Sequence, residues 1–425
     1  MTSPPPRSPT LWRHRNFMRL WSGEAGAQFG AEFGGIAIPV LAVAILGANE
    51  WEVGLLGAAG TLAFLVVGLP AGAWVDRSLK RRVMMRANIT RALAFGAIPI
   101  LWAAGALQMW HLIVLAAIIG FAQVFFDVAY QSYIPVLVPR DRISDANGKL
   151  ESTAQLAGVA GPGLGGLLLA VVQAPILLAA TAITYLGSFV AIASIRDEEV
   201  PAPRDKRRPL WTEIVEGLAF VWNQRLLRSI AACTALTNFF ASLLFTMLPL
   251  LVLRDLEISP ALYGIALYGI ALSVGAVGGL IGAVLAAPAS ERIGEGTVIP
   301  LSALLGVVGM VLFALMPVFP SIAIALLMVG NAVTSVSVLV YNIAQVSFRQ
   351  RICPVPLLGR MNASIRFVVW GVMPIAGVLS GVIATAIGIP ALLWLATAGV
   401  LLAAGFVVAS PLLGMRRLPT ELDAH

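Results

Sequence analysis

Long stretches without a charged residue constrain the fold of this chain more than any other feature. Seven stretches lack Asp, Glu, Lys and Arg, and a membrane-spanning helix needs only about 20 apolar residues. Turn-forming residues divide four of them in two, at 108–111, 173–175, 317–320 and 388–390. With an N-terminal stretch at 18–46, twelve spanning helices are predicted. The seven stretches are 53–75, 92–126, 152–195, 229–253, 258–290, 296–348 and 367–415.

The composition excludes soluble enzymes, fibrous proteins and disordered chains. Only 12% of the 425 residues are charged, whereas a soluble domain carries roughly 25%. The first apolar stretch is much longer than the apolar region of a signal peptide, so it is expected to remain as a transmembrane helix. Two cysteines and three histidines are scattered along the chain. Neither a disulfide framework nor a metal site is therefore predicted.

Basic residues predict how the helices cross the membrane. With twelve spans both termini lie on one side, and 27 of the 28 Lys and Arg residues fall on that side, including the Arg77–Arg91 cluster. Only Arg254 falls on the other side. Because basic residues remain on the cytoplasmic side, both termini are expected in the cytoplasm. The net charge of +7 is thus a topology signal, and nucleic-acid binding is not predicted.

The longest polar segment divides the chain into two halves. Residues 1–195 and 229–425 would each form a bundle of six helices, joined by a cytoplasmic linker at 196–228. Within the linker, Leu210–Leu227 has the pattern of an amphipathic helix on the membrane surface. Each half also carries a Pro-x-x-Gly sequence, at Pro162 and Pro374, in an equivalent helix. This correspondence predicts a transporter built from two repeats.

Polar residues recur on every third predicted helix, namely the first, fourth, seventh and tenth. Because polar side chains in a membrane are costly, they face the bundle interior. These four helices are therefore expected to line a central aqueous path. The candidates for the cavity and for proton coupling are Glu24, Gln28, Glu32, Gln123, Asn238, Asn331 and Tyr341.

Glu32 is the leading candidate for proton coupling. It lies near the middle of the first helix, and Glu24, Gln28 and Glu32 follow each other at intervals of four residues. An ionised carboxylate there costs about 3 kcal/mol on insertion scales. A carboxyl group that is neutral when dry and ionised when hydrated suits proton coupling. The alternative is that these carboxyl groups only bind a neighbouring helix, and for Asp127, nearer the cytoplasmic end, a structural salt bridge is the favoured role.

Two sequence motifs resemble those of a known family. Residues 72–82, Gly-Ala-Trp-Val-Asp-Arg-Ser-Leu-Lys-Arg-Arg, resemble the loop signature of the major facilitator superfamily, with Leu79 in place of glycine. Its second-half counterpart survives only at 291–294. The fifth helix resembles the export signature of the same superfamily, with Ala157 where glycine is usual. The matching positions of that signature are Gly161, Pro162, Gly165 and Gly166.

The resemblance implies an all-helical carrier whose two six-helix bundles rock around a central cavity. Segments around Arg91, 135–147 and 359–374 are similar to the exporters of enterobactin and macrolides. The resemblance also implies that Asp76 caps the N-terminus of the eleventh helix and that Lys80 pairs with Asp127. These contacts would close the cytoplasmic side. The latch residues are then Gly72, Asp76, Arg77, Lys80, Arg81 and Asp127.

These observations predict proton-coupled efflux of small lipophilic or amphiphilic molecules across a bacterial inner membrane. The partners are the substrate, protons and the lipid bilayer, and the carrier is expected to act as a monomer. No cofactor is predicted, no phosphate-binding loop suggests ATP, and no catalytic set suggests an enzyme. Two alternatives remain open. They are import of a nutrient by proton symport, and a non-transporting scaffold or sensor.

Overall fold

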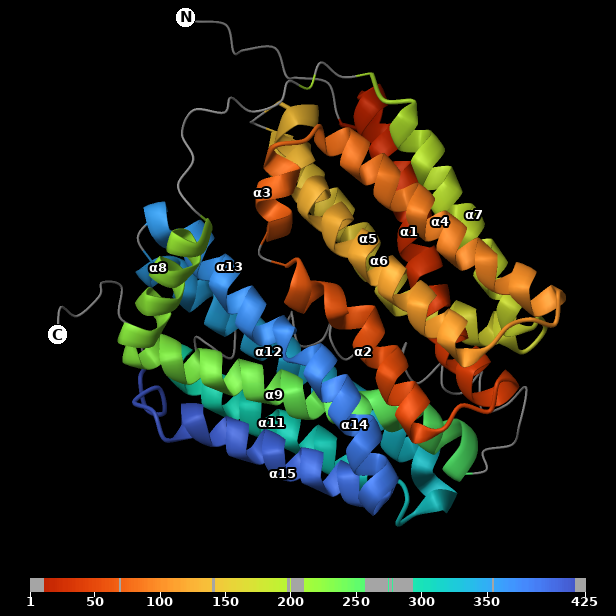
Figure 1. Cartoon of the computed structure of the whole chain (residues 1–425). Coiled ribbons are helices and arrows are strands. Elements are labelled where there is room, and N and C mark those ends of the chain that lie inside the picture. The colour runs from red at the N-terminus through yellow and green to blue at the C-terminus, as the bar shows by residue number, and fades with distance from the viewer. Residues whose placement is uncertain are drawn as a thin grey trace, which may run out of the picture.

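A computed structural model describes residues 11–68, 70–139, 142–196, 199, 210–256, 274, 277, 293–353 and 355–416. All the regular elements of these residues are helices (Figure 1). We call residues 11–196 the N-terminal half and residues 210–416 the C-terminal half.

The N-terminal half contains seven α-helices, of which the first continues into a π-helical turn, η2 (Leu41–Ile45). They are α1 (Arg15–Val40), α2 (Glu50–Val66), α3 (Pro70–Asp76), α4 (Lys80–Ala103), α5 (Met109–Leu137), α6 (Ile143–Leu169) and α7 (Ala174–Ala193).

The described part of the C-terminal half begins with a short helix, α8 (Leu210–Asn223), at the predicted amphipathic segment. The helices that follow are α9 (Arg225–Leu250) with the π-helical turn η4 (Leu251–Asp255), α11 (Glu295–Leu315), α12 (Ala323–Ile352), α13 (Val355–Gly371), α14 (Met373–Ile387) and α15 (Ile389–Val408). Two short 3-10 turns, η1 (Leu11–Arg13) and η5 (Pro320–Ile322), complete the described elements.

Eight helical segments in the described part are long and apolar enough to cross a membrane. The predicted span at 258–290 lies outside the described residues, apart from positions 274 and 277. Three further predicted spans fall on α2, α4 and α6, which are not among the eight. The membrane-spanning character is thus confirmed, and the total of twelve stays a prediction. The eight segments are Arg15–Ile45, Met109–Leu137, Ala174–Ala193, Arg225–Asp255, Gly296–Leu315, Pro320–Val346, Ser364–Ile387 and Ile389–Val408.

Local sequence explains several helix ends. Asn49 Oδ1 accepts a hydrogen bond from the Glu52 backbone N–H at 2.9 Å, and Glu52 Oε2 accepts one from the Asn49 backbone N–H at 3.0 Å. This capping box satisfies backbone donors that the first turn of α2 leaves free. Gly388, with φ of +82°, ends α14 in a conformation that favours glycine. The helix boundary predicted near 388–390 is therefore confirmed.

Helices α4 and α5 extend well beyond the charge-free stretch at 92–126. Helix α4 already begins at Lys80, and α5 continues to Leu137. Long basic side chains can place their stems on an apolar surface while the charge reaches water or a partner. Charges near a helix end therefore do not stop the helix, and charge-free stretches underestimate its length.

Among the described residues, most of the contact between the two halves lies toward one end of the molecule. They contact each other through α2 with α9, α13 and α14, and through η2 with η4. One buried apolar cluster, which includes Leu41 and Leu251, joins both halves there. Figure 1 shows the halves diverging toward the end that carries α3 and α8. That end holds separate clusters, around Tyr133 in one half and Phe348 in the other. We call it the basic end, and the other the opposite end.

Candidate functional site

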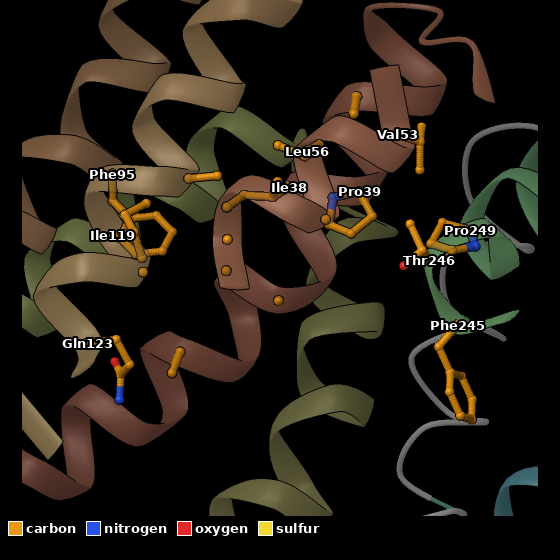
Figure 2. Close-up of a pocket in the computed structure, with 18 of the residues that line it drawn as sticks. Ile38, Pro39, Val53, Leu56, Phe95, Ile119, Gln123, Phe245, Thr246 and Pro249 are labelled. Carbon is orange, nitrogen blue, oxygen red and sulfur yellow. The ribbon is translucent and has the colours of Figure 1, made fainter. Parts of the chain in front are cut away.

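A cavity of about 490 Å³ lies between the halves, toward the opposite end. We call it the chamber. Helices α1, α2 and α5 form most of its wall, and α9 closes it from the C-terminal half (Figure 2). Its polar side chains are Gln123, Tyr185 and Thr246, and the rest of the lining is apolar or glycine. The apolar side chains labelled in Figure 2 include Ile38, Leu56, Phe95, Ile119, Phe245 and Pro249.

A buried arginine lies beside the chamber. Arg91 is only 2% exposed, and α4 places it about 16 Å from the start of the helix. Its Nη1 donates to Gln123 Oε1 at 2.5 Å, and its Nη2 donates to Asn88 Oδ1. The guanidinium lies over the rings of Phe126 and Tyr185, 4.3 and 4.4 Å from their centroids. Arg91 was expected in the Arg77–Arg91 cluster on the cytoplasmic side, but α4 carries its side chain into the interior.

Two buried carboxyl groups accompany Arg91. Gln123 Nε2 donates to Asp127 Oδ1 at 2.7 Å, and Gln28 Nε2 donates to Glu24 Oε1 at 2.7 Å. Glu24 is 7% exposed, and its second carboxyl oxygen has no hydrogen-bond partner among the described residues. Arg91 acts electrostatically on both carboxylates. We call Glu24, Gln28, Arg91, Gln123 and Asp127 the buried polar cluster.

Glu32 lies apart from this cluster. Each step of four residues turns the side chain by about 40° around the helix, so Glu24 and Glu32 differ by about 80°. Glu32 instead packs against α6, where a methyl group on Gly161 would lie 2.6 Å from Glu32 Cβ. Gly165 similarly faces Phe33 and Ile36. These two glycines of the predicted export signature therefore allow α6 to approach α1, and Pro162 and Gly166 are buried on the same helix.

The C-terminal half contains a second cavity, of about 280 Å³, between α9, α11 and α12. We call it the recess. The hydroxyl groups of Tyr341 and Thr234 lie 2.8 Å apart, and Asn238 Nδ2 donates to the Val369 carbonyl at 3.2 Å. None of the described residues that line the recess is charged. Asn331, predicted for the same cavity, is not in its lining and donates to a carbonyl of its own helix at 3.1 Å.

The structure contradicts the predicted pair between Lys80 and Asp127. Lys80 Nζ lies 3.5 Å from Glu199 Oε1, while Asp127 accepts from Gln123. Helix α5 continues ten residues beyond Asp127, or about 15 Å, so this carboxylate lies inside the helix bundle rather than at its basic end. Glu199 also accepts from the backbone N–H groups of Lys80 and Arg81, at 2.7 and 3.2 Å. A linker carboxylate thus caps α4.

The other predicted latch residues lie at different places in the structure. The Arg81 side chain donates to the last two carbonyl groups of α7, at 3.1 and 2.7 Å, where a helix end favours a cation. Gly72 borders a cavity between α5 and α13, and Arg77 is exposed. Asp76 ends α3, but its side chain lies outside the described residues, so its predicted capping role stays a prediction.

That cavity, of about 230 Å³, brings Asp127 of α5 to the same space as Arg366 of α13. The Arg366 guanidinium lies 5.3 Å from the Trp370 ring, which contacts Phe64 of α2 at 4.6 Å. Asp127 therefore faces a positive charge in each half.

The sequence analysis did not select Arg366 or Asn88. For Asn88 the available signal was its spacing of three residues from Arg91 on one helix face.

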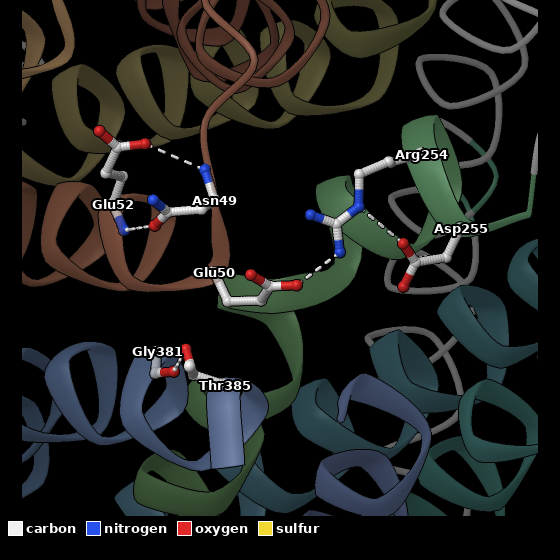
Figure 3. A network of polar contacts seen from close by, with 7 residues as sticks. All are labelled: Asn49, Glu50, Glu52, Arg254, Asp255, Gly381 and Thr385. Atoms are coloured by element: carbon white, nitrogen blue, oxygen red, sulfur yellow. Dashed lines mark hydrogen bonds and ion pairs between the residues drawn. The ribbon is translucent and has the colours of Figure 1, made fainter. Parts of the chain in front are cut away.

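The opposite end is closed by an ion pair and by glycines (Figure 3). Arg254 Nη2 lies 2.6 Å from Glu50 Oε1 across the two halves. The hydrogen bond from Arg254 lowers the pKa of Glu50. Beside this pair, a methyl group on Gly54 would lie 2.7 Å from the Gly377 carbonyl oxygen. Arg254, the one basic residue predicted for this side, thus joins the halves.

Comparison with known sequences finds one matching family and similar exporters. The profile of the Major Facilitator Superfamily matches residues 20–352. The multidrug efflux pump Tap of Mycolicibacterium fortuitum is 30% identical over 353 residues, covering 80% of this chain and 82% of that protein. The enterobactin exporter EntS of Salmonella choleraesuis (strain SC-B67) is 25% identical over 341 residues, covering 77% of this chain and 76% of that protein.

Solved structures with the same fold include transporters of different kinds. A mutant of the nucleoside transporter NupG superposes with a TM-score of 0.76 at 12% identity, covering 93% of this chain and 99% of that one. A bacterial homologue of the human lysosomal transporter Spinster, in an inward-facing and unoccupied conformation, gives 0.70 at 14% identity, covering 93% and 97%.

Proposed function

The chain belongs to the major facilitator superfamily, and from that premise we propose that it exports small lipophilic or amphiphilic molecules in exchange for protons. It is a transporter rather than an enzyme, and a multi-pass protein of the bacterial plasma membrane. Its relatives include a multidrug efflux pump and an enterobactin exporter. Alternating access would come from two six-helix bundles, at 1–195 and 229–425, that rock about the chamber as a monomer.

The observation that carries the proposal is the chamber beside the buried polar cluster. The chamber wall is apolar except for three side chains, so it suits an apolar molecule. One of these three, Gln123, also bonds both Arg91 and Asp127. A molecule that contacts Gln123 in the chamber would therefore be separated from the buried carboxylate of Asp127 only by the Gln123 side chain.

Proton coupling is assigned to Glu24 and Asp127, with Glu32 as a further candidate. Intramembrane carboxyl groups are costly unless they are paired, protonated or hydrated. Glu24 has one oxygen free of partners among the described residues, and it shares the positive charge of Arg91 with Asp127. A proton on either carboxyl group changes the net charge of the cluster. Binding of the proton and of the substrate can then exclude each other.

The test is transport by purified protein in liposomes with and without a pH gradient. Glu24→Gln and Asp127→Asn should lose uphill efflux of a lipophilic dye driven by the gradient. Exchange of the dye down its own gradient should survive, because the chamber is unchanged. Exposed Glu151 offers a matched control, and Glu151→Gln should transport normally. Undiminished gradient-driven efflux in a Glu24→Gln, Asp127→Asn double variant would move the coupling role to Glu32.

We assign the basic end to the cytoplasm, following the distribution of basic residues. Cys353, which follows α12 at the basic end, should then resist an impermeant thiol reagent added outside intact cells, and Cys233 inside α9 should resist it as well. Strong labelling of Cys353 from outside would reverse the orientation.

Import by proton symport is the second candidate. It is favoured by the uncharged hydrogen-bonding groups of the recess, since a polar nutrient needs such partners. The direction of pH-driven flux separates the two candidates, because a symporter accumulates substrate on the side to which protons flow. Accumulation against the proton flow supports export.

A further inference from the structure

The chamber and the recess share one side chain. Phe245 of α9 lines both cavities, and its ring packs edge to face against Phe313, with 5.4 Å between the ring centroids. Figure 2 shows Phe245 on the α9 side of the chamber, with Thr246 and Pro249 on the same helix. The two cavities are thus neighbours that share this aromatic residue.

The recess offers hydrogen-bonding atoms that no described residue uses. Asn238 donates through Nδ2 to a backbone carbonyl, and Asn342 accepts through Oδ1 from Gln345 Nε2 at 3.2 Å. The remaining amide atoms, Asn238 Oδ1 and Asn342 Nδ2, have no hydrogen bond among the described residues. Neither does the Ser242 hydroxyl, which also lines the cavity. An acceptor, an amide donor and a hydroxyl therefore remain for a ligand.

The recess contains no charge to balance an ionic ligand. None of the described lining residues is acidic or basic, and the sequence from 258 to 290 contains no Asp, Glu, Lys or Arg. A cation entering such a site loses its hydration without gaining a counter-charge. A hydroxyl, carbonyl or amide group exchanges water for the free atoms of Asn238, Ser242 and Asn342. The lining thus favours an uncharged, hydrogen-bonding group.

We propose that the chamber and the recess are two parts of one substrate site, separated by Phe245, and that the recess selects substrates with an uncharged, hydroxyl-bearing head such as a sugar. The inference rests on the proposed function, because the chamber would hold the apolar part of the exported molecule. The substrate class is then a neutral glycosylated or polyhydroxylated amphiphile rather than a lipophilic cation.

Three coumarin probes that share one apolar body test this selectivity. They are methylumbelliferyl glucoside, the corresponding methoxycoumarin without a sugar, and a trimethylammonium ether of the same coumarin. Equilibrium binding is measured on the full chain in lipid nanodiscs, without a gradient. The glucoside should bind about tenfold tighter than the methoxycoumarin, as one or two additional hydrogen bonds allow. The cationic ether should bind no tighter than the methoxycoumarin.

Variants locate the effect in the recess. Ser242→Ala and Asn342→Leu should each weaken the glucoside about fivefold to tenfold and leave the methoxycoumarin unchanged. Ser229→Ala, at a half-buried serine of the same helix that does not line the recess, should affect neither probe. Asn342→Asp should instead tighten the cationic ether, because it supplies the missing counter-charge.

The inference is overturned if the glucoside binds no tighter than the methoxycoumarin, or if the recess variants weaken all three probes equally. Failure of the proposed function has a different signature. In that case pH-driven dye efflux is absent, while the preference for the glucoside can still be read from binding alone.

Discussion

The two halves place different chemistry at corresponding positions. In the N-terminal half, the polar residues of α1, α4 and α5 form a buried cluster with two carboxylates and an arginine. In the C-terminal half, α9 and α12 carry hydroxyl and amide groups around a recess without charge. A chain whose sequence suggests duplication has thus separated two tasks. The buried carboxylates lie in the N-terminal half, and the recess with its neutral hydrogen-bonding groups lies in the C-terminal half.

The largest expected effect comes from removing the cation of the N-terminal half. Arg91→Met leaves Glu24 and Asp127 without the nearby guanidinium and frees the amides of Asn88 and Gln123. Loss of one partner from a buried ionic network costs about 3–5 kcal/mol. The thermal unfolding temperature of the purified protein should fall sharply, and pH-driven efflux should be lost. Arg86→Met, an exposed arginine of the same helix, is the control.

Wild-type stability and efflux in Arg91→Met would show that the cluster is not an electrostatic unit. The division of tasks between the halves would then lose its main support.

A second prediction concerns the contact through which the halves act on each other. A methyl group on Gly377 would lie 2.7 Å from the backbone nitrogen of Ala58. Overpacking of this kind costs about 1–3 kcal/mol, so Gly377→Val should open the opposite end. Spin labels on cysteines at Ala106 and Ile387 should report a longer distance. Gly405→Val is the matched control, because nothing lies within 4 Å of a methyl group there.

An unchanged label distance in Gly377→Val would mean that this glycine contact does not determine which end is closed.

Removing a polar group from the recess of the C-terminal half should have a milder effect than Arg91→Met has in the N-terminal half. Tyr341→Phe removes the hydroxyl that contacts Thr234 and that donates to the Ile230 carbonyl at 3.2 Å. The expected loss is about 1 kcal/mol of stability, measured by thermal unfolding. The pH dependence of efflux should not change, since no charge is removed. A shift of that pH profile comparable to the effect of Glu24→Gln would break the proposed division between the halves.

The smallest effect is expected at the exposed ion pair between Glu50 and Arg254. Such pairs contribute about 0.2–1 kcal/mol. Arg254 lowers the pKa of Glu50, so its contribution to closure is fully present above the ordinary pKa of Glu50. The contribution disappears as the pH falls through the lowered pKa of Glu50, on the acid side of its ordinary value. Label distances at Ala106 and Ile387 should therefore lengthen slightly in acid.

Glu50→Gln should show the longer distance already at neutral pH and lose the acid response. An acid response that persists in Glu50→Gln would assign the effect to another group.

The sequence predicted the helices better than it predicted their contacts. Charge-free stretches and the basic pattern are sufficient for the membrane spans because length and hydropathy are properties of one segment. The spacing of Glu24 and Gln28 likewise corresponds to the bond found between them. Lys80 and Asp127 were paired by resemblance alone, and the pairing failed because the true length of α5 was not visible in the charge pattern.

The position of Arg91 also depends on a helix length that the charge pattern does not show. It follows Lys80, Arg81, Arg82 and Arg86 closely, so the segment resembles one basic surface cluster. Only the start of α4 at Lys80 shows that Arg91 lies three turns inside the membrane-facing helix. The recess could not be found from the sequence either, because a cavity depends on how three helices pack. Asn238 and Tyr341 were expected to line a central cavity, but a recess separate from the chamber was not.

The glycine contact between α2 and α14 has a consequence for the rate of cycling. Gly54, Gly377 and Gly381 bring backbone against backbone and have no rotamers to fix when the halves dock. Immobilising long side chains would cost up to about 2 kcal/mol of conformational entropy for each one. A joint without side chains avoids that entropic loss at each closure. The opposite end can therefore close and release repeatedly with little change in side-chain disorder, as a reversible carrier requires.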